Sequence, residues 1–384
     1  MANLFLMPEC IYTGNDALDL AGEKIVKLGS KALIVTDNML IKLGSVKKLT
    51  DLLDKNGIKY EIYSEIYSEP TDVVVNNGIK KYKECKCDFL IGLGGGSSLD
   101  TAKAVGAMIT NKGKINDYLG KVIPNPIPPL VAIPTTAGTG SEVTQFTIIA
   151  DTERNIKMLL KGPHLIPRLA VIDPFFTLSA PPKVTSSTGL DALTHAVEAY
   201  TSRKAQPLSD TFAISAVKRI FKNLLKAYKN GSDVDARREM SIAALEAGIA
   251  FNNASVTIVH GMSRPIGALF HIPHGLSNAM LLNNCLKFAL KGTPERFCDL
   301  AKATEIYREG MTELEGGQVF IDAVEELCNN LNIQTLEQFG VDNDKYFDNL
   351  DKMAEDALQS GSPQNTRRNP EKKDIIDIYK SLWE

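Results

Sequence analysis

The residues of this chain best suited to chemistry are its few histidines. Only five occur in 384 residues, and three of them, His260, His271 and His274, lie close together in a largely apolar stretch. A fourth, His195, follows Asp191 by four residues, which puts both side chains on one face of a helix. An aspartate and a histidine at this spacing can also form a plain hydrogen bond. The three histidines at 260–274 are therefore the stronger indication of a metal site. Neutral imidazole and carboxylate suit first-row transition metals, and the pattern predicts a site for Zn²⁺ or Fe²⁺ made from one aspartate and three histidines.

A glycine-rich segment, 94–106 (GGGSSLDTAKAVG), follows the apolar run 88–93 (DFLIGL) and precedes a helical pattern. Glycines there allow a tight turn and a close approach of the backbone, and the N–H groups that open a helix suit a pyrophosphate. The segment matches neither the G-x-G-x-x-G fingerprint nor the P-loop, so its spacing leaves the ligand open. The alternative is a strand-to-helix turn with no ligand.

Two further features fit a nucleotide. Segment 134–142 (PTTAGTGSE) also follows an apolar run, and its hydroxyls and small residues supply donors without bulk, although a plain loop has the same composition. Asp37 ends the run 31–37 (KALIVTD), where a carboxylate can accept hydrogen bonds from a ribose and repel a 2'-phosphate. This position favours NAD over NADP.

The secondary structure expected to position these residues changes near residue 178, from alternating strands and helices to helices. Before it, short β-rich runs alternate with helical periods, which predicts a mostly parallel α/β sheet. After it, amphipathic helical patterns dominate, including one capped by Ser209 or Asp210 that ends at Asn230. We expect an α/β domain over 1–178 and a mainly helical domain over 179–384. The expected strands cover 31–37, 59–64, 88–93, 129–134 and 169–173, with a hairpin from 144–150 and 155–160; later helices include 234–251, 318–331 and 345–358.

Composition limits the possible partners. The 43 basic and 46 acidic residues give a net charge of −3. Proteins that bind nucleic acids or anionic membranes usually carry an excess of basic residues. None of the six cysteines has C-x-x-C spacing, and no apolar run reaches the roughly 18 residues of a membrane span. The N-terminus also lacks the basic start of a secretory signal. We therefore expect a cytoplasmic protein that binds neither nucleic acid nor membrane.

Taken together, these motifs resemble those of the iron-containing (group III) alcohol dehydrogenases. The resemblance extends over nearly the whole chain, with the motifs in the correct order. They are VTD (35–37), EPT (69–71), GGGSSLDTAKAVG (94–106), PTTAGTGSEVT (134–144), STGLDALTHAVEAY (187–200), IVHGMSRPIG (258–267), FHIPHGLSNAMLL (270–282) and NTRRNP (365–370).

The resemblance implies a Rossmann-like N-terminal domain, an all-helical C-terminal domain and a homodimer. It implies reversible hydride transfer between NAD(H) and a small primary alcohol, diol or aldehyde, with iron, or zinc in its place, as the metal. The implied metal ligands are Asp191, His195, His260 and His274. The implied coenzyme contacts are Asp37, Gly95, Gly96, Ser97, Asp100, Thr135, Thr136, Thr139, Lys157 and Leu178.

One position departs from the family pattern. Many members have a histidine four residues after the third metal ligand, and this chain has Arg264 there. Arginine stays charged near neutrality and is a poor base, so we expect either a contact with a polar part of the substrate or a salt bridge to a structural carboxylate. His271 is the nearby candidate for a proton relay, with a purely structural role as the alternative.

Three other functions use some of the same residues. A dehydroquinate-synthase-like lyase also combines NAD with a metal, but its phosphorylated substrate needs a more basic pocket than these motifs offer. A metal-dependent hydrolase would leave the glycine loop without a role. A non-catalytic NAD-binding module would bind the coenzyme without turnover.

Overall fold

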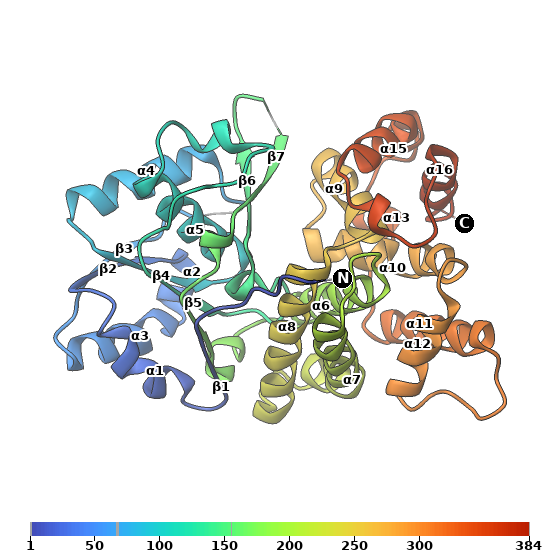
Figure 1. The fold of residues 1–384 in the computed structure, drawn as a ribbon, viewed down its shortest axis with the longest axis horizontal. Coiled ribbons are helices and arrows are strands. Elements are labelled where there is room, and N and C mark those ends of the chain that lie inside the picture. The colour runs from blue at the N-terminus through green and yellow to red at the C-terminus, as the bar shows by residue number, and fades with distance from the viewer. Residues whose placement is uncertain (1, 67–68, 155, 384) are drawn as a thin grey trace. The chain divides into compact units, whose positions relative to one another are not determined.

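The computed structural model describes residues 2–66, 69–154 and 156–383. It forms two compact units, Leu6–Ala180 and Met1–Phe5 together with Pro181–Glu384, which are described separately below (Figure 1). Asn155, where one expected strand starts, lies outside the described residues. The roles expected of segments 1–178 and 179–384 stay predictions at this point.

Within the described residues of the first unit, six strands form one parallel sheet in the order β1-β8-β5-β4-β2-β3, and β6 and β7 form an antiparallel hairpin. This confirms the expected parallel α/β architecture. The strands are β1 (Cys10–Thr13), β2 (Lys31–Val35), β3 (Lys59–Tyr63), β4 (Phe89–Gly94), β5 (Leu130–Pro134), β6 (Phe146–Asp151), β7 (Ile156–Lys161) and β8 (Leu169–Ile172). The helices are α1 (Ala17–Ile25), α2 (Asn38–Lys42), α3 (Ser45–Lys55), α4 (Asp72–Glu84) and α5 (Gly96–Thr110), with 3₁₀ turns η1 (Ile115–Tyr118), η2 (Ser141–Val143), η3 (Pro163–Leu165) and η4 (Pro174–Thr177).

Both faces of this sheet are buried, which explains why its strands are continuous apolar runs in the sequence. Alternate residues of β2 point to opposite faces: Ile34 packs in the cluster that contains α1 and α3, whereas Leu33 packs in the cluster that contains α4 and α5. The hairpin residues Ile149 and Leu160 join the second cluster. Helices therefore cover the sheet on both sides (Figure 1).

The order of the strands places a topological switch point between β2 and β4. These two strands are neighbours, but the chain leaves β2 through α3 toward one face and leaves β4 through α5 toward the other. In open parallel sheets, ligands bind outside the carboxyl ends of the strands at such a switch point. Asp37 and the glycine loop are the segments that follow these two strands.

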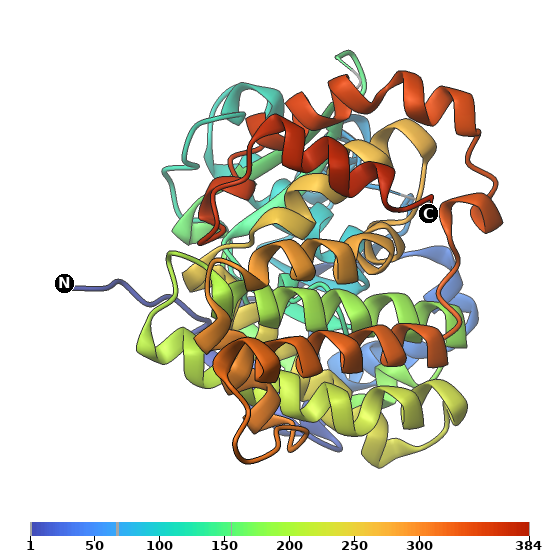
Figure 2. The same ribbon diagram turned by 90° about the vertical axis from the view of Figure 1, so that its right-hand side faces the viewer.

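The second unit is helical, as expected. Its long helices α6, α7 and α8 pack against one another (Figures 1 and 2), and Phe5 from the N-terminal segment stacks on Phe212 of α7. The helices are α6 (Pro182–Thr201), α7 (Pro207–Lys229), α8 (Val234–Ala254), α9 (Ile258–Phe270), α10 (His274–Leu290), α11 (Pro294–Ala303), α12 (Glu313–Asn330), α13 (Leu336–Phe339), α14 (Asn343–Asp348), α15 (Leu350–Gln359) and α16 (Lys372–Lys380), with the 3₁₀ turn η5 (Pro363–Asn365).

Two expected helix boundaries are wrong. Helix α7 starts at Pro207 rather than after Ser209 or Asp210. Gln206 is its N-cap, and the Ser209 hydroxyl accepts a hydrogen bond from the Gln206 backbone N–H at 2.9 Å as part of a capping box. The single helix expected over 345–358 is two helices that meet at Asn349, whose amide donates back to the carbonyl of Lys345.

No single helix in the described part of the chain is long and apolar enough to cross a membrane. Helices α8 and α9 satisfy the length and composition criteria only as a pair, across a bend of 103°. All six cysteines are free thiols.

Candidate metal centre and coenzyme loops

The two motifs expected to bind a nucleotide lie in contact at the carboxyl ends of β4 and β5. Gly94 and Pro134, the last residues of these strands, pair in register, and Thr135 N–H donates to the carbonyl of Gly94 at 3.0 Å. A Cβ on Gly96 would lie 2.9 Å from the Thr139 methyl group, closer than normal packing allows. The glycine at this position therefore lets the first turn of α5 lie against the second loop.

Asp37 lies where the sequence places it, directly after β2. It is the N-cap of α2, and its Oδ1 accepts hydrogen bonds from the N–H groups of Met39 and Leu40, both at 2.9 Å. These bonds fix the carboxylate at the switch point of the sheet. A fixed negative charge there opposes a second negative group on a ribose.

Asp100 points inward and holds the two loops together. Its Oδ1 accepts from the Ser141 hydroxyl at 2.6 Å, and its Oδ2 accepts from the Ile148 N–H at 2.9 Å. Burial raises the pKa of this carboxyl despite the nearby charge of Lys103. The coenzyme contact expected of Asp100 is thus accompanied by a clear structural role.

A buried lysine completes this arrangement, and the sequence analysis did not assign it a role. Lys103 has no exposed surface, and its ammonium donates to the carbonyls of Thr144 and Phe146 at 2.9 and 2.8 Å and to the Thr144 hydroxyl at 3.1 Å. Burial lowers its pKa to about 8 and raises that of Glu142, which is also buried, to about 7. The D-x-x-K spacing of Asp100 and Lys103 inside the glycine motif could have indicated this lysine, since both residues face one side of α5.

The remaining coenzyme candidates lie in less constrained surroundings. Lys157 on β7 forms an ion pair with Glu69 at 2.5 Å. Leu178 follows η4 and is partly buried.

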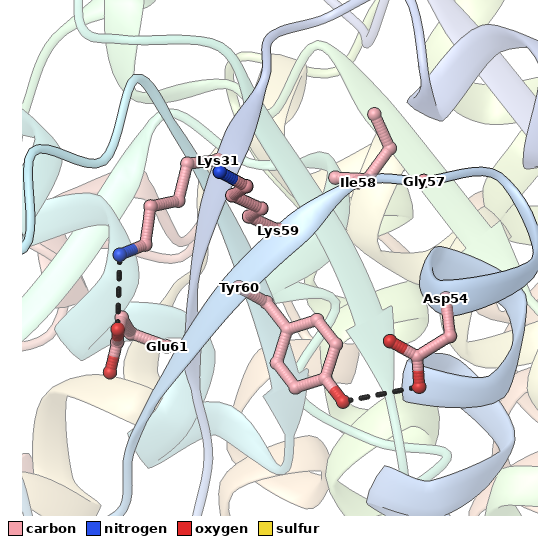
Figure 3. Close-up of a pocket in the computed structure, with 7 residues that line it drawn as sticks. All are labelled: Lys31, Asp54, Gly57, Ile58, Lys59, Tyr60 and Glu61. Atoms are coloured by element: carbon pink, nitrogen blue, oxygen red, sulfur yellow. Dashed lines mark hydrogen bonds and ion pairs between the residues drawn. The ribbon is translucent and has the colours of Figure 1, made fainter.

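A separate hollow of about 430 Å³ lies at the opposite edge of the sheet (Figure 3). It is lined by the starts of β2 and β3, with Lys31 paired to Glu61 and the Tyr60 hydroxyl donating to Asp54. Because ligands of parallel sheets bind at the carboxyl ends of the strands, this hollow is not the nucleotide site.

In the helical unit, the expected metal ligands come together. One ligand atom each from Asp191 and His195 on α6 and His260 on α9 lie within 4.8 Å of one another, and all three residues are buried. The rings of His195 and His260 stack with centroids 4.4 Å apart. His274, the first residue of α10, places Nε2 3.7 Å from Asp191 Oδ1, with about a third of its side chain exposed.

Burial and charge set the protonation of this cluster. Burial alone would raise the pKa of Asp191, but its neighbours His195, His274 and His260 outweigh burial and hold it well below its usual range. Burial lowers the pKa of His195 to about 3, so its imidazole is neutral at pH 7. A carboxylate and a neutral imidazole are the forms that bind metals.

The position of the Asn278 side chain indicates that the cluster suits a cation. Its Nδ2, which carries partial positive charge, lies 2.7 Å from Asp191 Oδ1, 3.1 Å from His260 Nε2 and 3.3 Å from His274 Nε2. Three lone pairs thus converge on one positive group. Among the described residues, the buried His195 Nδ1 has no hydrogen-bond partner. The cluster therefore fits a divalent ion with nitrogen and oxygen ligands.

Two residues beside the cluster have no role in the sequence analysis. Asn278 is fully buried one turn after His274 on α10, and Glu198 is fully buried on α6. Glu198 Oε2 lies 2.5 Å from His260 Nδ1. Glu198 follows Asp191 and His195 on the same face of α6, a spacing that could have identified it.

The two tentative catalytic residues lie in different settings. The Arg264 guanidinium, partly buried on α9, donates to the Ser362 hydroxyl at 3.1 Å. Both roles expected of Arg264, a substrate contact and a salt bridge to a structural carboxylate, stay predictions. His271 is exposed and ends α9 in the left-handed conformation at φ 54°.

An α/β unit of the nucleotide-binding type, followed in the chain by a helical unit with a buried carboxylate–imidazole cluster, fits a metal-dependent enzyme that uses a nucleotide. Comparison with known proteins agrees. Residues 8–174 match the family model "Iron-containing alcohol dehydrogenase", and residues 185–383 match the model of the C-terminal part of the same family.

Similar proteins span the whole chain. A 1,3-propanediol dehydrogenase from Citrobacter freundii is 36% identical over 99% of this chain and 98% of its own length. An NAD-dependent methanol dehydrogenase from Bacillus methanolicus is 35% identical over 99% of this chain and 100% of its own length. A crystal structure of 1,3-propanediol oxidoreductase superposes with a TM-score of 0.96 at 35% identity and covers 100% of both chains.

The chain therefore belongs to the iron-containing alcohol dehydrogenase family. It is a metal-dependent enzyme that interconverts alcohols and aldehydes. The matched relatives are dehydrogenases, which favours a redox reaction over the lyase considered from the sequence.

Proposed function

We propose that this enzyme transfers hydride reversibly between NAD(H) and a small primary alcohol, diol or aldehyde, with iron held by Asp191, His195, His260 and His274. The observation that supports it most is the convergence of Asp191 Oδ1, His260 Nε2 and His274 Nε2 on the Asn278 amide nitrogen. Relatives that act on 1,3-propanediol and methanol support small alcohols and diols as substrates.

The four proposed ligands come from three helices. Asp191 and His195 bind from one face of α6, and Asp191 neutralises half of the charge of a divalent cation. His260 and His274 complete the site from α9 and α10. When bound, the ion supplies a Lewis acid that stabilises negative charge on the substrate oxygen. The family favours iron, and zinc is compatible with the same donors.

The coenzyme is held by the loops at the carboxyl ends of β2, β4 and β5. The N–H groups of Gly95, Gly96 and Ser97 at the start of α5 bind the pyrophosphate, and Thr135, Thr136 and Thr139 supply hydroxyl donors beside them. Asp100 contributes by fixing Ser141 and the start of β6. Lys157 and Leu178 complete the set. NAD(H) supplies or accepts the hydride at its nicotinamide ring.

Asp37 selects NAD(H) over NADP(H). Its carboxylate is fixed by two backbone N–H groups at the switch point, which supports hydrogen bonds to a ribose and repulsion of a 2'-phosphate. The relative described as NAD-dependent supports the same choice.

Three finer assignments complete the proposal. Arg264, whose guanidinium contacts only a neutral hydroxyl among its described polar partners, contacts a polar part of the substrate. His271, exposed at the end of α9, relays a proton to solvent. The chain acts as a cytoplasmic homodimer, and its free thiols are consistent with a reducing compartment.

An anaerobic assay tests the function directly. Metal-free protein is reconstituted with Fe²⁺ or Zn²⁺ and mixed with NADH or NADPH and a panel of short aldehydes. We expect metal-dependent NADH oxidation with short unbranched aldehydes and much weaker oxidation of NADPH. Coenzyme binding without turnover of any aldehyde would contradict the proposal and favour a non-catalytic module.

A further inference from the structure

Glu198 connects α6 and α9, the two helices that carry three of the four candidate metal ligands. It lies on α6, seven residues after Asp191 and three after His195, and has no exposed surface. Its Oε1 accepts from the Thr257 hydroxyl at 2.7 Å and from the Val259 N–H at 2.6 Å, at the start of α9. Its Oε2 contacts His260 Nδ1 at 2.5 Å.

These contacts determine which nitrogen of His260 is protonated. Both oxygens of the Glu198 carboxylate face donors: the Thr257 hydroxyl and the Val259 N–H point at Oε1, and the His260 ring lies against Oε2. The carboxylate can then only accept, so Nδ1 of His260 carries the hydrogen. On the other side of the ring, Nε2 faces the Asn278 Nδ2, which is a donor because it also binds the Asp191 carboxylate. Both neighbours therefore leave the Nε2 lone pair directed at the cluster.

We propose that Glu198 is a positioning residue that fixes the tautomer and orientation of His260, so that Nε2 is held ready to bind the metal. This inference rests on the proposed function of the cluster. A carboxylate that accepts from a metal-binding imidazole also makes the ring a stronger ligand. The same carboxylate accepts from the first turn of α9, where negative charge is favoured, so one group orients both the ring and the helix that carries it.

A purely structural role makes a different prediction. If Glu198 only capped α9, replacing it with glutamine, which keeps the shape and one acceptor, would change stability without a specific effect on the metal. A positioning role requires that metal affinity falls while the fold is preserved.

The experiment compares Glu198→Gln with the wild type and with Glu246→Gln. Glu246 is a largely buried carboxylate on α8 that accepts from Ser215 and Arg219, away from any histidine. Dissociation constants for Zn²⁺ and Co²⁺ are measured by competition with a chromophoric chelator, and folding by circular dichroism. We expect about a 10–100-fold weaker metal affinity in Glu198→Gln with an unchanged spectrum, and wild-type affinity in Glu246→Gln. Wild-type affinity in a folded Glu198→Gln would overturn the inference.

Nuclear magnetic resonance of zinc-loaded protein with labelled histidine gives a second, independent readout. We expect His260 to carry hydrogen on Nδ1 and a metal-shifted Nε2. Metal on Nδ1 with hydrogen on Nε2 would overturn the inference even if Glu198→Gln failed to fold.

The outcome also separates the two proposals. If Asp191→Ala loses the metal while Glu198→Gln keeps it, the positioning role fails and the proposed function stands. If the wild-type chain takes up no divalent ion, the proposed function fails and the positioning role fails with it.

Discussion

At the scale of single residues, metal binding at the candidate site depends on the protonation states that burial and neighbouring groups give to its ligands. His195 is kept neutral by burial, which lowers its pKa to about 3, and Asp191 is kept ionised by the histidines around it. Both are ready to bind a cation at pH 7 without first exchanging a proton. Removing one ligand should therefore remove the metal rather than merely slow the reaction.

The variant His260→Ala tests this directly. We expect metal content to fall to background and kcat/KM for aldehyde reduction to fall by about 1000-fold, the effect of losing roughly 4 kcal/mol of charge stabilisation. Metal content is measured by mass spectrometry, and the rate with NADH as coenzyme. His164→Ala, which changes an exposed histidine of η3, is the matched control and should keep both. A metal-free His260→Ala with normal turnover would refute the metal-dependent mechanism.

The proposed preference for NAD(H) depends on one residue, Asp37. Asp37→Asn keeps an N-cap side chain for α2 but removes the charge. We expect the ratio of kcat/KM for NADPH to that for NADH to rise by about tenfold, since removing a like charge near a phosphate is worth on the order of 1 kcal/mol or more. The exposed Asp51→Asn on α3 serves as control. An unchanged ratio would mean that Asp37 does not face the 2'-position.

At the scale of elements, the buried Lys103 joins α5 to the segment that follows η2, and the buried carboxyl of Glu142 in η2 lies near enough to act on its charge. Lys103 satisfies its ammonium with the carbonyls of Thr144 and Phe146 and the hydroxyl of Thr144. Glu142 is fully buried and has its pKa raised from 4.5 to about 7 by burial. Between these two values the folded chain keeps a proton on Glu142 that the unfolded chain has released.

Stability should therefore fall as pH rises from 4.5 to 7, because the unfolded state binds fewer protons in that window. Glu142→Gln removes this contribution. We expect the variant to match the wild type near pH 4.5 and to be more stable by about 3 kcal/mol at pH 8. Chemical unfolding of both proteins across this range gives the difference. A difference that does not change with pH would show that Glu142 titrates normally.

Elements differ in how well the sequence predicts them. The strands of the parallel sheet are apolar runs because both faces are buried, so 31–37, 88–93 and 129–134 were identified within a few residues. Edge strand β1 (Cys10–Thr13) was missed, since it is short and only partly buried. Helix α9 was not delimited, because Pro265 lies inside it and interrupts the usual helical pattern.

The site was predictable where residue type alone limits the chemistry. Histidines and one aspartate indicated a metal, and the structure brings Asp191, His195 and His260 together. Glu198 and Asn278 were missed because glutamate and asparagine on a helix are usually solvated, and only the fold reveals that both are buried against ligand atoms. Which tautomer His260 adopts depends on those neighbours and not on local sequence.

At the scale of the whole molecule, the proposed metal ligands and the proposed coenzyme contacts belong to different units. The candidate metal ligands all lie on α6, α9 and α10, whereas the candidate coenzyme contacts all lie in the unit that ends at Ala180. A ligand stabilises the part of the fold that forms its site, by an amount that depends on its free concentration relative to Kd. Metal and coenzyme should therefore protect different segments of the chain.

Hydrogen exchange read out by mass spectrometry checks this expectation. Adding Zn²⁺ to metal-free protein at a free concentration of 100 times Kd should slow exchange in α6, α9 and α10 by up to about 100-fold, equivalent to roughly 2.7 kcal/mol, and leave β2, β4 and β5 unchanged. NAD⁺ alone should instead protect the starts of α2 and α5. In His260→Ala the response to Zn²⁺ should vanish while the response to NAD⁺ persists, because that variant leaves the coenzyme loops intact. Equal protection of both units by Zn²⁺ would contradict the assignment of the metal to the helical unit alone.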